Sequence, residues 1–285
     1  MILTRLGAPD FDLAQTLDSG QVFYWQALGP GYAGMIGDLA VYMEQRGDQL
    51  LVTRGAATAA RRYFALDHPL REICAAFPRD PALDAARVYC AGLRIMRQPL
   101  WECLASFITS SMKQVAHIRQ MSRALRERWG EPHALGDLRL YSFPSAARVA
   151  EVTEKELRAC GLGYRAKNLL GTARLIAAGE ANLESWRHEA DDELRARLCA
   201  LPGVGPKVAN CVMLFAYERL RAFPIDVWIE RVLKEQYFPR ARKLTAARLR
   251  TFCQEYFGVQ GGYAQQYLFH HARKTAVRTR RQAGT

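Results

Sequence analysis

The chain has 285 residues, with 40 Lys and Arg against 28 Asp and Glu and a formal net charge of +12. A hydrophobic fraction of 49% with 24% charged residues excludes global disorder, and the absence of any run of about 18 apolar residues excludes a membrane-spanning helix. Residues 1–7 lack a basic segment followed by an apolar one, so we expect no secretion.

The seven cysteines are scattered, and none has the Cys-x-x-Cys spacing of zinc or redox sites. We therefore expect free thiols in a reducing compartment. We expect no catalytic metal, iron–sulfur cluster or other cofactor.

The positive charge is unevenly distributed. Residues 1–60 hold three Arg against six acidic residues, whereas residues 87–130 hold eight Lys or Arg against two Glu. The end of the chain adds Arg273, Lys274, Arg278, Arg280 and Arg281 without any acidic residue. A localised positive field favours a polyanionic partner, most simply nucleic acid, only slightly over a basic, well-solvated surface.

The first part of the chain has the pattern of short strands separated by turns. Aromatic and β-branched residues predict strands at residues 22–27, 32–36, 39–45 and 49–53. Gly-Asp pairs at residues 37–38 and 47–48 supply tight turns. This close spacing predicts an antiparallel meander.

After residue 56 the apolar residues recur with helical spacing. This spacing predicts helical segments at residues 101–108, 115–125, 154–160, 165–178, 192–201, 208–217, 226–237 and 246–257. The predicted fold class is α+β and mainly α. We expect an N-terminal antiparallel sheet domain with helices (1–97), a helical body (98–272) and a basic tail (273–285), whose last dozen residues have the composition of a disordered segment. The sequence leaves open whether this tail binds DNA or is simply disordered.

The most informative segment is a predicted helix-hairpin-helix at residues 193–217. Pro202 ends the first helix, and Gly203 and Gly205 permit a tight hairpin that exposes backbone N–H groups. These groups lie at the N-terminus of the second helix, which favours anions. The pattern is typical of proteins that hold the DNA phosphodiester backbone without reading bases.

Lys207 directly follows this hairpin, where a lysine either contacts phosphate or acts as a nucleophile. Asp226 stands at a predicted helix start, where it can act as an N-cap and the helix dipole favours its anion. A lysine shielded from water is biased toward the neutral amine, which can attack carbon. A nearby carboxylate stabilises the positive charge on a sugar that loses its base. The pair therefore favours N-glycosidic cleavage followed by a Schiff base.

With these features the chain resembles the helix-hairpin-helix DNA glycosylases, and within them a divergent branch of the 8-oxoguanine DNA glycosylase (OGG) family. The resemblance spans about residues 10 to 272. It rests on five motifs in the family's order, namely Leu17–Trp25, Trp101–Ile108, Gly161–Ala166, the hairpin with Lys207 and Asp226, and Tyr263–Phe269.

The resemblance implies a bifunctional DNA N-glycosylase and DNA-(apurinic or apyrimidinic site) lyase of base excision repair. Such an enzyme excises an oxidised purine, most simply 8-oxoguanine, from damaged double-stranded DNA and nicks the strand by β-elimination. We expect a monomer that does not bind membranes. Its location would be the nucleoid-associated cytoplasm of a prokaryote or the nucleus of a eukaryote.

The resemblance also implies a base pocket. The Gly20 carbonyl would accept the N7–H that 8-oxoguanine has and guanine lacks. Cys211 and Phe269 would sandwich the flipped base, and Gln265 would meet its Watson–Crick edge. Without the resemblance, a turn glycine, a buried thiol and a solvated glutamine are the simplest interpretations of these residues.

The implied DNA interface follows from the need to extrude the target nucleotide. Tyr164 would wedge into the base stack, and Arg165 would hydrogen-bond the base left unpaired. The remaining DNA-facing positions are Met112, Lys113, His117, Gly203, Gly205 and Trp228. The carbonyls of Cys199, Leu201 and Val204 resemble a monovalent-cation site.

Two departures from the family pattern change these expectations. Met112 replaces an Asn that fills the gap left by the flipped base, and His117 replaces an Arg that reads the orphan cytosine. Of the residues that usually recognise the base left unpaired, only Arg165 then remains. This weakens the basis for strict discrimination in favour of cytosine opposite the lesion. Trp228 and Ala272 together replace a His–Asp pair, which indicates a repacked pocket edge.

Two other functions stay open on the sequence. A glycosylase for another damaged base, such as an alkylated purine, is opposed by Lys207, because such enzymes often lack this lysine. A non-catalytic protein that binds DNA structures would use the hairpin as a clamp and would need neither Lys207 nor Asp226.

Overall fold

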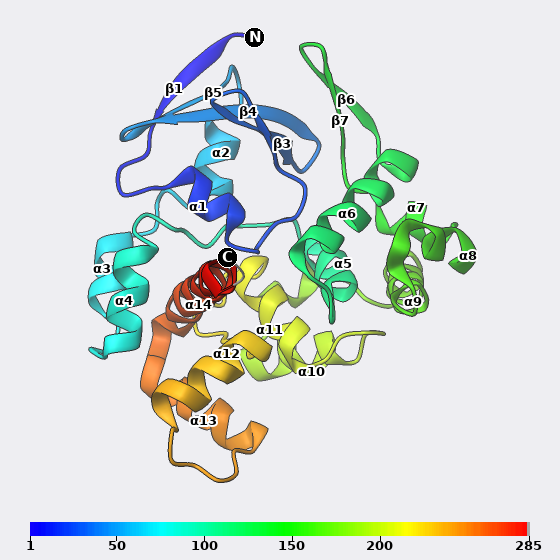
Figure 1. Cartoon of the computed structure of the whole chain (residues 1–285). Coiled ribbons are helices and arrows are strands. Elements are labelled where there is room, and N and C mark those ends of the chain that lie inside the picture. Colours follow the sequence, from blue (N-terminus) through cyan, green and yellow to red (C-terminus); the bar gives the residue numbers. More distant parts are fainter. Residues whose placement is uncertain (284–285) are drawn as a thin grey trace.

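The computed structural model describes the backbone of residues 1–283 and the side chains of residues 1–276. Its N-terminal part is an antiparallel sheet in the order β1-β5-β4-β3-β2 (Figure 1). The strands are β1 (Leu3–Gly7), β2 (Gln26–Leu28), β3 (Gly31–Ile36), β4 (Leu39–Arg46) and β5 (Gln49–Thr53). The predicted meander is confirmed from β2 to β5, whereas β1 was not predicted. The strand predicted at residues 22–27 is wrong over most of its length, because pairing with β3 begins only at Gln26.

Two glycine turns allow the meander to form. Gly37 and Gly47 have φ values of +58° and +56°, in the left-handed region that glycine adopts most easily. Each lies in the short turn between two paired strands. Alternate side chains of β4 and β5 then pack against α1 (Leu13–Asp18) and α2 (Ala57–Tyr63) in one hydrophobic cluster.

Helices form most of the rest of the molecule, as predicted. They are α3 (Leu70–Ala75), α4 (Pro81–Tyr89), α5 (Leu100–Ser110), α6 (Val115–Trp129), α7 (Ala146–Ala150), α8 (Glu154–Leu157), α9 (Arg165–Ala177), α10 (Asp191–Cys199), α11 (Pro206–Phe215), α12 (Val227–Val232), α13 (Ala246–Phe257) and α14 (Gly261–Ala283). A hairpin of β6 (Pro132–Leu135) and β7 (Leu138–Tyr141) packs on β3 and β4. The sequence analysis missed it because each strand has only four residues.

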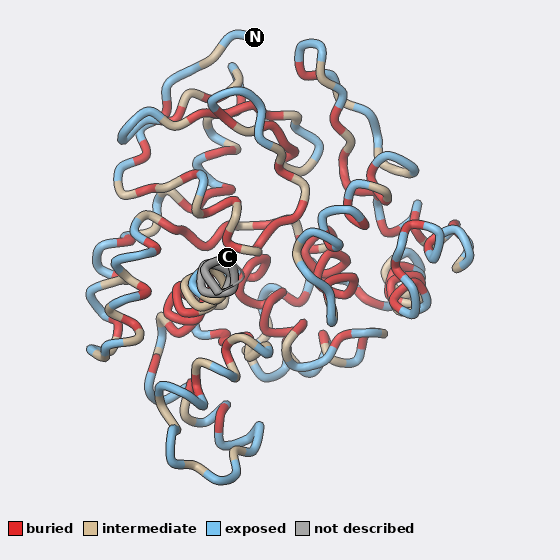
Figure 2. The backbone as a smooth tube through the Cα atoms, in the orientation of Figure 1, coloured by how far each residue is buried: buried red, intermediate tan, exposed pale blue. Residues whose placement is uncertain are grey.

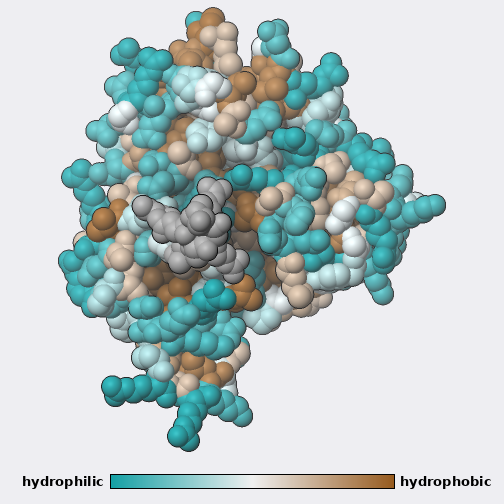
Figure 3. All heavy atoms as spheres, viewed as in Figure 1, coloured by the Kyte–Doolittle hydropathy of each residue, from teal (hydrophilic) through white to brown (hydrophobic). Residues whose placement is uncertain are grey.

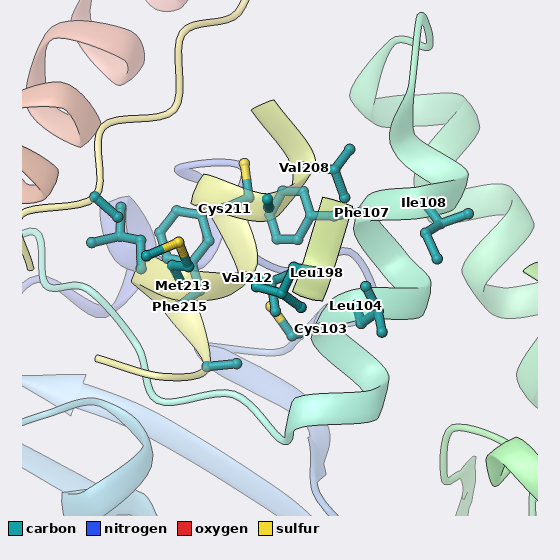
Figure 4. Close-up of a cluster of buried hydrophobic side chains, with 14 of the residues drawn as sticks. Cys103, Leu104, Phe107, Ile108, Leu198, Val208, Cys211, Val212, Met213 and Phe215 are labelled. Carbon is teal, nitrogen blue, oxygen red and sulfur yellow. The ribbon is translucent and has the colours of Figure 1, made fainter. Parts of the chain in front are cut away.

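Helix α5 lies at the centre of the helical body. Ten of its eleven residues are buried, and Figure 2 shows that the neighbouring α11 is also mostly buried. Figure 4 shows Leu104 and Phe107 of α5 facing Val212 of α11. Phe107 stacks on Phe215 with ring centroids 5.5 Å apart. Each such buried side chain stabilises the fold by about 1.5–3 kcal/mol, so this packing fixes the position of α11, whose first turn carries Lys207.

A buried ion pair joins α5 to α6 beside the sheet. Glu102 Oε1 and Arg126 Nη2 are 2.6 Å apart, and both side chains are buried. Arg126 also lies over the Tyr24 ring, 3.8 Å from its centroid, and donates to the Tyr141 carbonyl over 2.9 Å. Burial raises the pKa of Glu102 despite the opposing effect of Arg126. The pair therefore connects the sheet, α6 and the β6–β7 hairpin.

The last helix is longer than expected. Disorder was expected for the last dozen residues, but α14 continues as one helix from Gly261 to Ala283. That expectation is therefore wrong as far as Ala283, and residues 284–285 lie outside the described part of the chain.

The surface is mainly polar on the face drawn in Figure 3. Apolar side chains gather at its upper edge, near the N-terminus, where Met1 and Ile2 are exposed. Among the helices that the structure describes, none combines the length and apolar character needed to cross a membrane.

We expect Arg126→Met to destabilise the protein by about 3–5 kcal/mol, because Glu102 would stay buried without its partner. Combining it with Glu102→Leu replaces both charges by apolar groups and should recover most of the lost stability. Urea unfolding measures both effects. If Arg126→Met alone is as stable as the wild type, the ion pair does not stabilise the junction of α5 and α6.

Candidate active site

The predicted helix-hairpin-helix is confirmed as α10, a tight loop and α11. Gly203 has a φ of +79°, and a Cβ atom there would lie 2.7 Å from Cβ of Asn168 on α9. The Thr172 hydroxyl, also on α9, donates to the Pro202 carbonyl over 3.0 Å. Gly205 is exposed and caps α11 with an extended backbone. Helix α9 thus holds the hairpin from one side, and the N-terminus of α11 faces solvent.

Lys207 lies in the first turn of α11 and is half-buried. Its Nζ is 5.1 Å from the centroid of the Phe107 ring, so α5 forms one wall beside the amine. Cys211 lies one helical turn further on and is 3% exposed. Burial raises the pKa of Cys211 to about 11, although the neighbouring Lys207 lowers it. Cys211 is therefore a neutral thiol next to the amine.

Asp226 caps α12, as predicted. Its Oδ1 accepts the backbone N–H groups of Trp228 and Ile229 over 3.0 and 2.9 Å. Burial raises the pKa of Asp226, and the bond from Ile229 and the charge of Lys207 lower it only in part. The predicted N-cap role is therefore confirmed, and the pKa of Asp226 lies above its usual value because burial outweighs these two lowering effects. Since the Lys207 charge also affects Cys211, the structure brings all three groups into one site.

Gly20 and Phe269 also lie together, as predicted. Gly20 has a φ of +86°, and a Cβ atom there would lie 3.1 Å from Cε1 of Phe269. The Ser19 carbonyl before it accepts a 2.9 Å bond from Gln266, and the Asp18 carbonyl accepts one from Arg273. The loop after α1 is therefore fixed to α14 by its backbone carbonyls.

Gln265 is 4% exposed, not solvated. Its Oε1 is buried and has no hydrogen-bond partner in the described structure. Such an oxygen costs free energy unless a donor reaches it, so it marks a polar position that a ligand can satisfy.

The residues predicted to face DNA form an exposed group around the α5–α6 loop. Met112 is 92% exposed and has a φ of +54°, which few residues other than glycine adopt. Lys113 and His117 beside it are also exposed. Tyr164 is 53% exposed at the start of α9. The projection of Met112 and Tyr164 into solvent suits side chains that enter a base stack.

Arg165 differs from its prediction. It is 4% exposed, and its Nε donates to the Ser111 carbonyl over 2.7 Å. A second guanidinium nitrogen bonds to the same carbonyl, and Nη1 donates to Leu162 over 3.3 Å. Its Cζ lies 4.4 Å from the centroid of the Tyr164 ring. In this structure Arg165 is not free to bond an orphan base, because it holds the loop that carries Met112.

Trp228 is half-buried, and Arg231 lies over its ring at 5.6 Å. Among the three carbonyls predicted to hold a monovalent cation, that of Leu201 accepts the Val204 N–H over 3.1 Å, and the cation site stays a prediction. Within the described residues, no group of three or more His, Cys, Asp or Glu side chains could hold a metal ion. All seven cysteines are free thiols, as predicted.

A cluster of charges that was not predicted from the sequence lies beside Gly20 and Phe269. Asp18 pairs with Lys274 and, over 3.3 Å, with Arg119. Arg273 adds a third cation, and its Cζ lies 5.5 Å from the centroid of the Phe269 ring. The basic residues after His271 could be seen in the sequence. Their contact with Asp18 was not predicted, because they were expected to belong to a tail.

Two family models match consecutive parts of the chain. Residues 4–104 match the N-terminal domain of 8-oxoguanine DNA glycosylase, and residues 105–255 match the HhH-GPD superfamily of base excision DNA repair proteins. The resemblance found in the sequence is thereby confirmed. These matches do not favour either alternative, the glycosylase for alkylated purines or the non-catalytic DNA binder.

Individual proteins agree with the family models. The chain is 30% identical to N-glycosylase/DNA lyase OGG1 of Arabidopsis thaliana over 93% of this chain and 78% of that protein. It is 30% identical to a probable N-glycosylase/DNA lyase of Methanothermobacter thermautotrophicus over 71% of this chain and 69% of that one. The crystal structure of Clostridium acetobutylicum 8-oxoguanine glycosylase/lyase, in complex with double-stranded DNA containing cytosine opposite 8-oxoG, superposes with a TM-score of 0.89. It is 31% identical, and the match covers 97% of this chain and 99% of that chain.

We expect Gly203→Ala to destabilise the hairpin by about 1–2 kcal/mol or more, because a non-glycine residue is strained at this φ and its Cβ would overlap Asn168. Gly205→Ala is the matched control, since no atom lies within 4 Å of its added Cβ. Thermal unfolding measures the difference between the two variants. Equal stability would contradict the packing of the hairpin on α9.

Proposed function

The chain belongs to the 8-oxoguanine DNA glycosylase family of the helix-hairpin-helix superfamily, and we propose that Lys207 and Asp226 perform its chemistry. It is a bifunctional N-glycosylase and DNA lyase of base excision repair that acts on 8-oxoguanine in DNA. The observation that supports the residue assignment is the shared site of Lys207, Cys211 and Asp226 at the junction of α11 and α12.

Lys207 acts as the nucleophile in this proposal. Its neutral amine attacks C1′ of the damaged nucleotide, the N-glycosidic bond breaks, and the base leaves with that electron pair and takes up a proton. The Asp226 carboxylate stabilises the positive charge that develops on the sugar. Ring opening gives a Schiff base between Nζ and C1′. Loss of a proton from C2′ then expels the 3′ phosphate and nicks the strand.

The pocket for the flipped base consists of uncharged groups. The Gly20 carbonyl accepts the N7–H of 8-oxoguanine, while guanine would place a lone pair against it. Phe269 and the neutral Cys211 thiol cover the two faces of the base. The unpaired Oε1 of Gln265 accepts a donor from the Watson–Crick edge, which would satisfy a buried acceptor.

Arg165 acts as a positioning residue instead of a reader of the orphan base. Its two bonds to the Ser111 carbonyl hold the residue directly before Met112. Met112 then fills the gap left by the flipped base with an apolar side chain, and Tyr164 wedges beside it. Neither a thioether nor an aromatic ring reads a base edge, so the preference for cytosine opposite the lesion should be weak.

The remaining assignments follow from the same function. We propose that the protein acts as a monomer, with Gly203 and Gly205 holding the DNA backbone through the N-terminus of α11. Lys113, His117 and Trp228 contact the DNA around the extruded nucleotide. The chemistry needs no cofactor, and the enzyme works beside its substrate, in the nucleoid-associated cytoplasm of a prokaryote or the nucleus of a eukaryote.

We expect Lys207→Gln to abolish the covalent adduct that borohydride traps on an 8-oxoguanine duplex, because an amide cannot form the Schiff base. Lys243→Gln removes an exposed lysine in the loop before α13. This control variant should form as much trapped adduct as the wild type. Denaturing gels measure the adduct, and a parallel duplex with an alkylated purine tests the lesion class. An adduct that persists in Lys207→Gln would refute the assignment.

We expect Arg165→Ala to slow excision by the same factor whichever base stands opposite the lesion, because it loosens the Met112 loop. Single-turnover rates on four duplexes, one for each opposite base, measure this effect. One bidentate base contact provides about 1–3 kcal/mol of discrimination. A loss of rate confined to the duplex with cytosine would therefore show that Arg165 reads the orphan base after all.

A further inference from the structure

A cavity of about 290 Å³ lies where the N-terminal sheet, α6 and the β6–β7 hairpin meet. Tyr24 and Trp25, in the segment before β2, line it together with residues of β2 and β3, and α6 contributes one helical face from Ala116 to Glu127. Lys207, Cys211 and Asp226 are not part of this lining. We call this cavity the arginine pocket, because four arginines line it, namely Arg119, Arg123, Arg126 and Arg139.

The charges of this pocket are unbalanced. Glu127 is the one acidic residue in its lining. Arg126 is neutralised by Glu102, and Arg119 lies 3.3 Å from an Asp18 carboxylate that it shares with Lys274. Within the described part of the chain, the structure shows no ion pair for Arg123 or Arg139, both of which are exposed.

Arg123 and Arg139 come from different elements and line one cavity. Arg123 lies on α6, and Arg139 lies on β7. Like charges in a shared cavity repel each other, and a bound anion removes that repulsion. A guanidinium donates through a planar fork that matches phosphate oxygens, so arginines from two sides can bind one phosphate group.

The rest of the lining adds neutral donors and a rigid floor. Gln26 and Gln120 present amide groups at the wall. Arg126 forms part of the floor, and its buried Nε has no hydrogen-bond partner. The Tyr24 hydroxyl donates to the Met35 carbonyl and lies 2.9 Å from the Tyr63 hydroxyl, so its hydrogen bonds stay within the protein. The pocket therefore presents more donors than acceptors.

We propose that the arginine pocket binds a phosphate group, separately from the base pocket and the hairpin. Two sources have this chemistry, a phosphodiester of the bound DNA and a free phosphate or phosphate monoester. The recognising groups are Arg123 and Arg139, assisted by Arg119 and the two glutamines. The volume is near the lower end of ligand sites, which fits a small anion or one phosphate of a chain.

The test uses Arg123→Gln with Arg139→Gln in the full chain. Arg54→Gln with Arg61→Gln is the matched control, since it removes the same charge from exposed positions outside the pocket. Calorimetric titration with inorganic phosphate, at constant ionic strength balanced with NaCl, measures the affinity for free phosphate. The salt dependence of binding to an 8-oxoguanine duplex measures how many phosphates of the DNA backbone the protein contacts.

If the pocket holds free phosphate, the pocket variant loses at least tenfold in phosphate affinity and the control does not. If it holds a DNA phosphate, the binding constant K for the duplex depends less steeply on salt in the pocket variant. The magnitude of the slope of log K against log salt then decreases by about 0.9 more in the pocket variant than in the control. Equal behaviour of both variants in both titrations would overturn the proposal. Borohydride trapping at low salt should stay at the wild-type level in both, which separates failure of this site from failure of the catalytic assignment.

Discussion

The position of Phe107 determines how the two parts of this enzyme meet. Its ring stacks on Phe215 of α11 at 5.5 Å and meets Phe23, in the segment before β2, edge to face at 5.9 Å. The Lys207 amine lies 5.1 Å from the same ring. One side chain of α5 thus lies beside the N-terminal segment, the second helix of the hairpin and the Lys207 amine. Because interiors are closely packed, a shift of this ring would move all three.

Charge and specificity are assigned to different parts of the molecule. The uncharged pocket suits a choice between two bases that differ by one hydrogen-bonding group, since a misplaced charge would bind both. Besides Lys207, whose amine neighbours Cys211, cations lie on the Met112 loop, on α6 and on α14. Arg273 and Lys274 bond to the backbone and the carboxylate of Asp18 and so fix the Gly20 loop, and Arg273 also lies over the Phe269 ring at 5.5 Å.

The sequence predicted the parts of this site that depend on local pattern. The hairpin glycines, the N-cap role of Asp226 and the spacing between Lys207 and Cys211 are local, and the structure confirms them. The bond from Arg165 to the Ser111 carbonyl could not be predicted, because the two residues are 54 positions apart and their contact leaves no pattern in the sequence. The burial that raises the pKa of Asp226 could not be predicted either, since it depends on tertiary packing. The β6–β7 hairpin was missed because two four-residue strands resemble a loop.

In the proposed function, the left-handed backbone of Gly20 lets a single carbonyl recognise the base. A carbonyl in a flexible loop would rotate to relieve a clash with guanine, and the discrimination would be lost. Here the preceding carbonyls of Asp18 and Ser19 are bonded to α14, and any side chain at residue 20 would press on Phe269. Glycine lets the loop turn at this point, and α14 prevents it from relaxing. If Gly20 has the role we propose, the specificity of the pocket depends on the two side-chain bonds to the Asp18 and Ser19 carbonyls as much as on the Gly20 carbonyl itself.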